Sequence, residues 1–347
     1  MFKAHLLAVS TLAIVLASCG TREGSLPSTI TPVPTSPTAM ATPFLPILPT
    51  LSATPTPAPS MTPTPTPTPV EPWENFPGPS LKSSTEIPRI IRDIVSPKET
   101  VNIIILGTDD AWWRRSMNAD TMVLISIDPE QGTVKMISFP RDLFVYLPGR
   151  NMARINTAYA YGGPELVALT LRYNFGIEVD YYARVNFASF EKAVDALGGI
   201  DVVVGNGFTD SCGKTSYSYQ SGRSYHMDGW TALCYVRMRN APGGDFARQR
   251  RAQEILLAIF RKAISLEGLT RLPEFYEQYS RMVETDMDLT DMLALLPTAA
   301  QVAQDPTRIE GFTLAGLTRS WTTPDGGAVL LPDKEGVQTL LTEIFKK

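Results

Sequence analysis

Histidine and cysteine are scarce in this chain of 347 residues, which contains two histidines and three cysteines. The histidines are His5, within a signal-like segment, and His226. A Ser-His-Asp triad depends on a histidine base, and catalytic zinc sites usually use two or three histidines. The sequence therefore nearly excludes a histidine-dependent triad and a metal site built from several histidines.

An excess of basic residues is also absent. The formal net charge is −4 at pH 7, and the isoelectric point is about 5.4. Domains that bind nucleic acid generally carry a basic patch and a high isoelectric point. We therefore expect no nucleic-acid partner.

The N-terminus lacks a hydrophobic run long enough for a stable transmembrane helix. Residues 6–17 are about a dozen apolar or small residues, whereas a membrane span needs about 20. The run ends in Leu-Ala-Ser-Cys19, which resembles a bacterial lipobox. In such a signal residues 1–18 are removed and Cys19 is acylated, so we expect an extracytoplasmic protein anchored to the cell membrane. The alternative is an ordinary secretory signal in which Cys19 stands by chance.

Threonine and proline dominate residues 21–80, with repeats such as Thr-Pro-Thr-Pro-Thr-Pro at 62–67. This composition cannot bury a core, and its prolines favour extended polyproline II. We expect residues 19–85 to be a disordered linker that acts as an inert spacer. Residues 86–347 remain, which is enough for one large domain with a substantial core.

Apolar runs and amphipathic segments alternate through this domain and predict an α/β fold. The expected strands are 101–107, 121–127, 133–139, 181–185, 200–204, 231–238 and a short one near 309–314. The expected helices are 155–161, 164–173, 187–197, 246–263 and 334–345, with 205–224 a loop and 271–303 mainly helical. Because strands and helices interleave, we predict a single mixed β-sheet with helices on both faces.

Two arginines, Arg237 and Arg239, stand two residues apart in the expected strand 231–238. Residues i and i+2 of a strand share a face at about 7 Å, where two guanidiniums repel by about 2–3 kcal/mol at an effective dielectric of 20. Arg141 and Arg248 would add to this repulsion if they converge on the pair. A phosphate or pyrophosphate between them would turn the repulsion into a binding site. The alternative is a solvated strand face without a ligand.

Carboxylates are expected at the same edge of the sheet. Asp109 and Asp110 follow the first strand, and Asp120 precedes the second. Adjacent strands would bring Asp109 and Asp120 together, and two carboxylates beside a pyrophosphate can hold Mg²⁺. The alternative is that these residues only stabilise turns.

Several ordered sequence blocks resemble the LytR-CpsA-Psr (LCP) family of bacterial cell-envelope proteins. They include Asn-Ile-Ile-Ile-Leu-Gly-Thr-Asp at 102–109, Ser-Phe-Pro-Arg-Asp at 138–142, Ala-Leu-Cys-Tyr-Val-Arg-Met-Arg at 232–239 and Gly-Asp-Phe-Ala-Arg at 244–248, with further blocks at 119–122, 154–163, 180–187, 194–200 and 227–229. The resemblance is strong over residues 100–265 and looser towards the C-terminus. It implies an LCP-like α-β-α sandwich at 86–347, with a core at 100–265 and a helical extension at 266–347.

The resemblance also implies a chemistry, a cofactor and partners. LCP proteins resemble Mg²⁺-assisted phosphotransferases that move a glycopolymer from a polyprenyl-pyrophosphate carrier to peptidoglycan through a phosphodiester, in cell wall assembly. The expected partners are thus the carrier-linked glycan, the peptidoglycan acceptor and the membrane under the lipid anchor. Phosphoryl transfer needs positioning and charge neutralisation more than covalent help from the protein. We expect an apolar tunnel for the carrier lipid between the sheet and the helices at 155–173.

Transferred motif by motif, the resemblance assigns roles to particular side chains. Asp109 and Asp120 correspond to the metal-associated carboxylates. Asp245 corresponds to an acidic residue that orients an arginine or serves as a base, and it forms the expected catalytic set with Arg237 and Arg239. The expected pyrophosphate-binding arginines are Arg141, Arg154, Arg237, Arg239 and Arg248.

Two positions depart from the family pattern. Arg154 stands where the family usually has Lys, which keeps the charge and changes the reach. Ala252 stands where the family usually has Gln, and Gln249 and Gln253 are expected on other faces of the helix. The departure at Ala252 gives weight to an alternative function, a lipoprotein that binds polyprenyl phosphates without transfer. A polyprenyl-pyrophosphate phosphatase that uses water as acceptor is the other alternative.

The two cysteines that remain after Cys19 are Cys212 and Cys234. An even number of cysteines in an exported, oxidising compartment favours a disulfide. We therefore predict a bridge between Cys212 and Cys234 that fixes the 205–224 loop behind the arginines. The alternative is two separate thiols, with Cys234 buried as a small apolar residue.

Overall fold

A computed structural model describes residues 76–80, 83, 85–93, 95–109, 117–265 and 282–346. All of these belong to the unit Pro67–Lys347. The expected signal segment, Cys19 and the Thr/Pro tract up to residue 75 lie outside the described residues. The same holds for Asp110 and for residues 266–281, which include part of the expected helical segment at 271–303.

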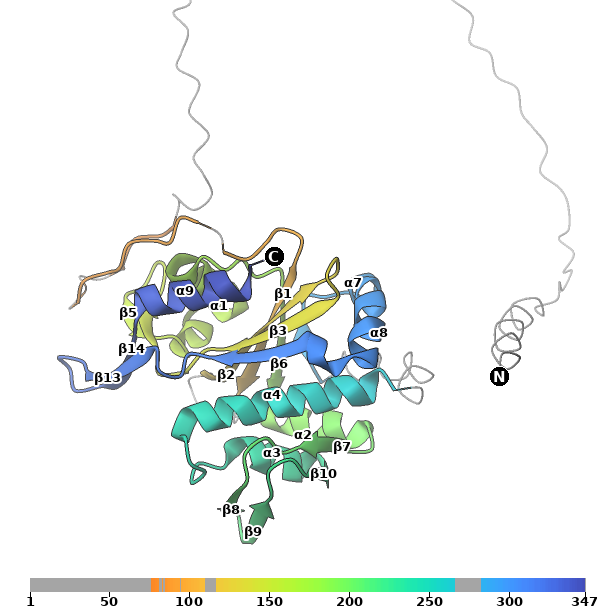
Figure 1. The fold of residues 1–347 in the computed structure, drawn as a ribbon. Helices are drawn as coiled ribbons and strands as arrows, with labels where there is room; N and C mark the ends of the chain where they lie inside the picture. Colours follow the sequence, from red (N-terminus) through yellow and green to blue (C-terminus); the bar gives the residue numbers. More distant parts are fainter. Residues whose placement is uncertain are drawn as a thin grey trace, which may run out of the picture. The chain divides into compact units, whose positions relative to one another are not determined.

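A six-stranded mixed sheet forms the centre of the fold (Figure 1). Its spatial order is β11 (Glu284–Thr285), β6 (Tyr181–Asn186), β1 (Val101–Thr108), β2 (Ala119–Asp128), β3 (Thr133–Ser138) and β12 (Ile309–Thr313). The β1 strand pairs antiparallel with β2 and parallel with β6, and β3 pairs parallel with β12. The predicted mixed sheet is confirmed.

The β1 strand is central because both of its faces are apolar. Ile104 and Leu106 are fully buried on one face, while Ile105 and Gly107 point to a cavity on the other. A strand buried on both sides reads as a continuous apolar run rather than as an alternating one. This explains why the run at 101–107 was predictable from sequence.

One face of the sheet is covered by α1 (Thr157–Phe175) and α9 (Lys334–Ile344). Their apolar side chains pack on the sheet in one core, which includes Val167, Leu171, Val337, Leu341, Ile104, Leu124 and Ile137. The backbone of α1 leaves helical geometry at Gly162 and Gly163, where φ of Gly163 is 64°. The predicted break between helices 155–161 and 164–173 is therefore confirmed as a kink.

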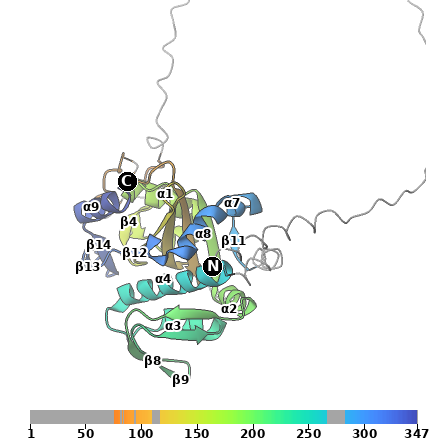
Figure 2. The same cartoon turned by 45° about the vertical axis from the view of Figure 1, so that its right-hand side comes forward.

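The other face of the sheet is crossed by α4 (Gly244–Ala263), as Figures 1 and 2 show. Gln253 of α4 donates to Ser138 Oγ at 2.8 Å and to the Phe312 carbonyl at 2.8 Å, which ties the helix to β3 and β12. Beyond α4 lie α2 (Phe187–Ala196) and α3 (Gly229–Arg237), around a second core that contains Val194, Ile200, Tyr235 and Ile255. Helices on both faces confirm the predicted α/β class.

Four two-stranded antiparallel sheets complete the part of the chain that the structure describes. They are β4 (Phe144–Tyr146) with β5 (Met152–Arg154), β7 (Ile200–Val203) with β10 (Ser224–Met227), β8 (Phe208–Cys212) with β9 (Thr215–Tyr219), and β13 (Thr318–Thr322) with β14 (Ala328–Pro332). The chain also forms α7 (Leu289–Ala294), α8 (Leu296–Gln304) and a short 3-10 helix, Pro306–Arg308. Among the described helices, none is both long enough and apolar enough to cross a membrane.

The segment 231–238 is a helix and not the predicted strand. Asp228 caps α3 by accepting from the Thr231 backbone N–H at 2.8 Å, and an N-cap aspartate is a strong signal for helix initiation. Burial of Ala232 through Tyr235 between α2, α4 and the β8–β9 hairpin then overrides the strand preference of the β-branched and aromatic residues. The expected loop 205–224 was also wrong, because it forms β8, β9 and the start of β10.

Candidate active site

Strand pairing brings the predicted carboxylates to one edge of the sheet. Thr108, the last residue of β1, pairs with Ala119 of β2, and the register shifts at this point. Asp109 follows Thr108 directly and Asp120 follows Ala119, so both lie at the same irregular end of the β1–β2 pair. Bulges of this kind re-aim side chains next to functional sites.

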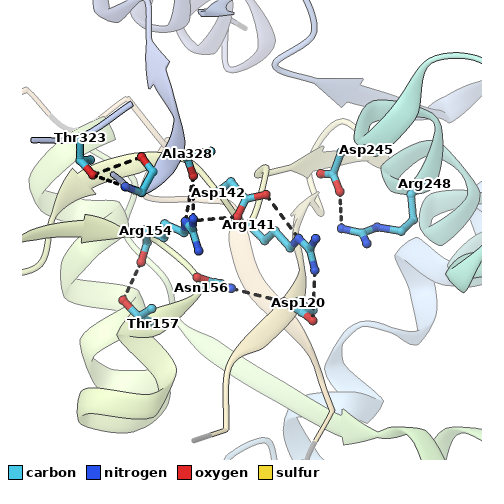
Figure 3. A network of polar contacts seen from close by, with 11 residues as sticks. Asp120, Arg141, Asp142, Arg154, Asn156, Thr157, Asp245, Arg248, Thr323 and Ala328 are labelled. Carbon is cyan, nitrogen blue, oxygen red and sulfur yellow. Dashed lines mark hydrogen bonds and ion pairs between the residues drawn. The ribbon is translucent and has the colours of Figure 1, made fainter. Parts of the chain in front are cut away.

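Asp120 lies in a network of alternating charges (Figure 3). Its Oδ2 is 3.3 Å from Arg141 Nη1, and its Oδ1 accepts from Asn156 Nδ2 at 3.3 Å. Asp142 bridges the next two cations, because its Oδ2 lies 3.5 Å from Arg141 Nε and its Oδ1 lies 3.5 Å from Arg154 Nε. The network thus joins β2, the segment after β3, and β5.

The first turn of α4 supplies the other half of the site. Asp245 accepts from Arg248 through Oδ1 and from Gln249 Nε2 through Oδ2, the latter at 3.1 Å. Gly243 is the N-cap residue of α4 and Gly244 is its first residue, and their φ angles are 96° and 56°. These two glycines allow the sharp turn into α4, because other residues rarely adopt positive φ. Asp245 is therefore engaged in orienting Arg248 and Gln249.

The electrostatics of Arg141 and Arg248 show that the two halves face each other. Burial alone lowers the pKa of Arg141, but Asp120, Asp142 and Asp245 attract its charge and raise the pKa. Burial lowers the pKa of Arg248, Asp245 opposes this, and repulsion from Arg141 and Arg239 lowers it further. The charges of Arg141 and Arg239 therefore both act on Arg248, and such a gathering of cations suits an anion.

Arg237 and Arg239 are close to the site, but not as neighbours on a strand face. Arg237 is the last residue of α3, and its guanidinium lies 4.7 Å from the centre of the Phe187 ring. Arg239 follows the helix and is exposed, within the electrostatic reach of Arg248. The predicted i, i+2 strand geometry is wrong, because the two arginines stand on either side of a helix end. Of the two, Arg239 is the one whose charge acts on Arg248.

Two buried contacts fix the turn that carries Arg239. Arg251 donates to the carbonyl of Met238 and places its guanidinium 4.6 Å from the Phe208 ring centre. The structure also contains the expected disulfide between Cys212 and Cys234, with the Cα atoms 5.7 Å apart. It connects the end of β8 to α3, behind the site.

An apolar cavity of about 210 Å³ adjoins the charged site. Its walls come from β1, β6, α2, α3 and α4, and include Ile105, Phe187, Phe190, Leu233, Ile255 and Ile259. Three residues, Thr121, Val236 and Ala252, line both this cavity and the small pocket of Asp120, Arg141, Asp245 and Arg248. The interface between the sheet and the helices at 155–173, where we expect a lipid tunnel from sequence, is filled by the α1–α9 core, and the apolar cavity lies on the opposite face of the sheet.

Asn156 and Gln249 belong to the site although they were not assigned to it from sequence. Gln249 was expected on another face of α4, but it lines the charged pocket and is held by Asp245. Asn156 contacts Asp120 from the start of α1. The signal for Gln249 was its i, i+4 spacing from Asp245, which places both side chains on one helix face.

The donor set of the site fits Mg²⁺, which takes oxygen ligands from one or two carboxylates, substrate phosphates and water. Asp109 and Asp120 supply the carboxylates. Asn156 Oδ1 and Gln249 Oε1 are buried oxygens without a hydrogen-bond partner among the described residues. Within the described ranges no group of three or more His, Cys, Asp and Glu side chains could hold a metal by itself. The residues fit a metal shared with substrate phosphates better than an all-protein cage.

Arg154 connects the site to the β13–β14 hairpin. Its Nη2 and Nε donate to the carbonyl of Ala328 at 2.7 and 3.1 Å. Leu330 donates to the carbonyl of Asp142 at 2.9 Å, so β14 also supports the segment that carries Arg141. The C-terminal part of the domain is therefore a structural component of the site.

Comparisons with known proteins match the same part of the chain. Residues 80–346 match the LytR_cpsA_psr family. The polyisoprenyl-teichoic acid–peptidoglycan teichoic acid transferase TagU of Oceanobacillus iheyensis is 34% identical over 240 residues, which cover 65% of this chain and 72% of that protein. The protein of the same name from Bacillus subtilis is 30% identical over 200 residues, or 57% of this chain and 63% of that protein.

Solved structures share the fold. The crystal structure of B. subtilis TagV has a TM-score of 0.61 and 28% identity, covering 72% of this chain and 98% of that chain. The structure of TagT bound to LI-WTA has a TM-score of 0.57 and 28% identity, covering 71% of this chain and 90% of that chain.

Proposed function

This chain belongs to the LytR_cpsA_psr family, and from that premise we propose that it transfers a glycopolymer from a polyprenyl-pyrophosphate carrier to peptidoglycan. One observation supports this proposal most strongly. The arginine-rich pocket and the apolar cavity share Thr121, Val236 and Ala252 in their walls. A ligand that fills both spaces must be an anion joined directly to a hydrocarbon chain, as a polyprenyl pyrophosphate is.

The cations of the site would bind the pyrophosphate. Arg141 and Arg248 line the same small pocket, and Arg239 lies within the electrostatic reach of Arg248. Guanidiniums suit this role because their planar forks bind phosphate oxygens in pairs. Arg237 lies over the ring of Phe187, which lines the apolar cavity, and so would lie beside the first part of the lipid.

The reaction is a substitution at the phosphorus nearest the glycan. A hydroxyl oxygen of the acceptor forms a bond to this phosphorus, and the bond to the bridging oxygen breaks. Polyprenyl phosphate leaves with that oxygen, and the hydroxyl proton passes to solvent or a nearby base. The arginines stabilise the charge that accumulates on the phosphate oxygens. Because these side chains are already held in position, they lower the activation barrier without having to reorganise during the reaction. Asp245 serves by orienting Arg248 and Gln249.

Magnesium is proposed as the cofactor on chemical grounds. Figure 3 shows Asp120, Asp142 and Asp245 beside Arg141, Arg154 and Arg248, so each carboxylate of the network has an arginine partner. Asp109, Asp120 and the free oxygen of Asn156 would hold Mg²⁺ next to the phosphates. A bound Mg²⁺ would neutralise phosphate charge and polarise the phosphoryl group.

We also propose that the protein works outside the cytoplasm on a lipid anchor at Cys19. The lipobox-like sequence and the Thr/Pro tract support this, since an extended spacer would let the domain reach the wall while its lipid stays in the membrane. Mass analysis of the membrane fraction should find an acylated Cys19 as the first residue. Retention of residues 1–18, or cleavage elsewhere, would contradict the proposal.

Incubation of the full mature protein with carrier-linked glycopolymer, Mg²⁺ and peptidoglycan tests the function. Covalently attached polymer and released polyprenyl phosphate are the expected products. An Arg248→Ala variant should form neither at a comparable rate, whereas Arg250→Ala, an exposed position of the same helix, should remain active. Retained lipid without product would identify a binding protein instead. Free glycopolymer bearing a phosphate, without attachment, would identify a hydrolase.

A further inference from the structure

A second cavity, of about 420 Å³, lies next to the β4–β5 hairpin and away from the apolar cavity. Its lining includes Phe144, Met152, Trp321, Arg89, Arg319 and Lys334. The Phe144 and Trp321 rings contact each other with their centres 5.7 Å apart. The proposed reaction does not use any of these residues.

Strands β4 and β14 contribute residues to the lining of this cavity and also contact the charged site. Phe144 pairs with Arg154 across the β4–β5 hairpin. Only two residues separate Phe144 from Arg141, so the Cα atoms of these two residues lie within about 11 Å of each other. Leu331 lines the cavity, and its neighbour Leu330 donates to the carbonyl of Asp142. The same β-structure therefore supports the charged site and walls the cavity.

The charge of the cavity selects for an anion. Arg89, Arg319 and Lys334 line it, and Glu86 is the one acidic residue in its lining. These three cations are exposed, and none of them forms an ion pair with a residue that the structure describes. Aromatic rings with nearby cations suit a sugar chain that carries carboxylates, because the rings cover apolar faces of sugars and the cations bind the acid groups.

The in-line geometry of phosphoryl transfer indicates from which side the acceptor approaches the phosphorus. In phosphoryl transfer the attacking and leaving oxygens lie roughly in line. The leaving polyprenyl phosphate would occupy the apolar cavity on the α4 side, near Asp245 and Arg248. Figure 3 shows Arg154 and Ala328 on the opposite side of Arg141 from Arg248. The acceptor must therefore approach past Arg154 and the β13–β14 hairpin, which leads towards the second cavity.

We propose that this cavity is the acceptor subsite, which binds the peptidoglycan strand beside the hydroxyl that is attacked. The proposal rests on the transfer function proposed above. Phe144 and Trp321 contact the sugar rings, and Arg89, Arg319 and Lys334 bind carboxylates of the strand and its peptides. A volume of about 420 Å³ lies within the range of pockets that enclose drug-sized ligands, so it holds one or two sugar units.

Calorimetric binding of a soluble, uncrosslinked peptidoglycan fragment to the full mature protein tests the proposal without requiring transfer. The variant Arg319→Glu with Lys334→Glu reverses two exposed charges, and Trp321→Ala removes the aromatic wall. Lys214→Glu, exposed in the turn between β8 and β9, is the matched charge control. Each test variant should weaken fragment binding by about tenfold or more, the size expected for lost charge-assisted contacts. The control should bind like the wild type.

Two further titrations separate the possible occupants. Polyprenyl pyrophosphate should bind all four proteins equally, which also shows that the variants fold. A soluble glycopolymer fragment without lipid should not depend on the three cavity residues. Three outcomes would contradict the proposed subsite. The wild type does not bind the peptidoglycan fragment, the variants bind it as well as the wild type does, or the variants weaken binding of the glycopolymer fragment instead. A wild type that binds the fragment as expected and forms no product would contradict only the transfer function.

Discussion

Arg141 Nη1 lies 3.3 Å from Asp120 Oδ2, so a proposed phosphate-binding cation and a proposed metal-binding anion form an ion pair. Both side chains are mostly buried, with exposed fractions of 22% and 29%. The ion pair holds each group in position before the substrate arrives. Pyrophosphate must then compete with Asp120 for Arg141. A cation such as Mg²⁺ that neutralises the Asp120 carboxylate should therefore favour phosphate binding to Arg141.

This linkage predicts a specific effect of Asp120→Asn. Binding of pyrophosphate without metal should be unchanged or stronger, because Arg141 loses a competing anion. The increase in affinity that Mg²⁺ gives the wild type should disappear. Isothermal titration with and without Mg²⁺ measures both quantities. Asp142→Asn is the control, since Asp142 also contacts Arg141 but is not a proposed metal ligand. If Asp120→Asn keeps the Mg²⁺ enhancement, the metal role of Asp120 is wrong.

The arginines should contribute unequally to pyrophosphate binding. Arg248→Ala and Arg239→Ala should each weaken it by about 1.5–3 kcal/mol, the contribution of a hydrogen bond to a charged group. Arg237→Ala should cost less with free pyrophosphate than with the polyprenyl form, because Arg237 stacks on Phe187 at the apolar cavity. Arg250→Ala should have no effect. Equal losses for Arg237 with both ligands would place it in the phosphate site instead.

The sequence predicted the site residues better than it predicted their geometry. Apolar runs identified β1 and β2, and Gly-Gly-Asp identified the start of α4, because these features are local. The helix at 229–237 was read as a strand, since Tyr235 and Val236 favour strands and the capping role of Asp228 was missed. Distant contacts decided the outcome there: Tyr235 is buried against Phe208 and Tyr219 from the β8–β9 hairpin. The face that holds the apolar cavity was also unpredictable, because it depends on where α1 and α9 pack.

Ala252 lines both the charged pocket and the apolar cavity, at the place where the two spaces adjoin. Ala252→Leu should fill this passage and weaken binding of polyprenyl pyrophosphate by about tenfold or more, while free pyrophosphate still binds. The fold should lose about 1–3 kcal/mol through overpacking. Ala258→Leu is the matched control, because Ala258 is equally buried in α4 but lies in the second core. Equal loss of both ligands in Ala252→Leu, with none in the control, would show that the two spaces are not joined there.

The disulfide should stabilise α3 and the turn after it, which carry Arg237 and Arg239. Cys212→Ala with Cys234→Ala opens a loop of 22 residues, for which chain entropy predicts a loss of about 3 kcal/mol in unfolding free energy. Denaturant titration measures this loss, and pyrophosphate affinity should fall with it because the turn after α3 carries Arg239. Thiol titration of the denatured, unreduced mature protein should find no free thiol. Two free thiols would contradict the bridge.

The fate of the phosphorus nearest the glycan tests the central claim most directly. A carrier-linked glycopolymer with radioactive phosphorus at that position is incubated with the full mature protein, Mg²⁺ and peptidoglycan. Transfer through a phosphodiester predicts that the label becomes covalently bound to peptidoglycan, with an equal amount of unlabelled polyprenyl phosphate released. Label that stays in the lipid fraction, or that appears only on soluble glycopolymer or as inorganic phosphate, would contradict the proposed transfer.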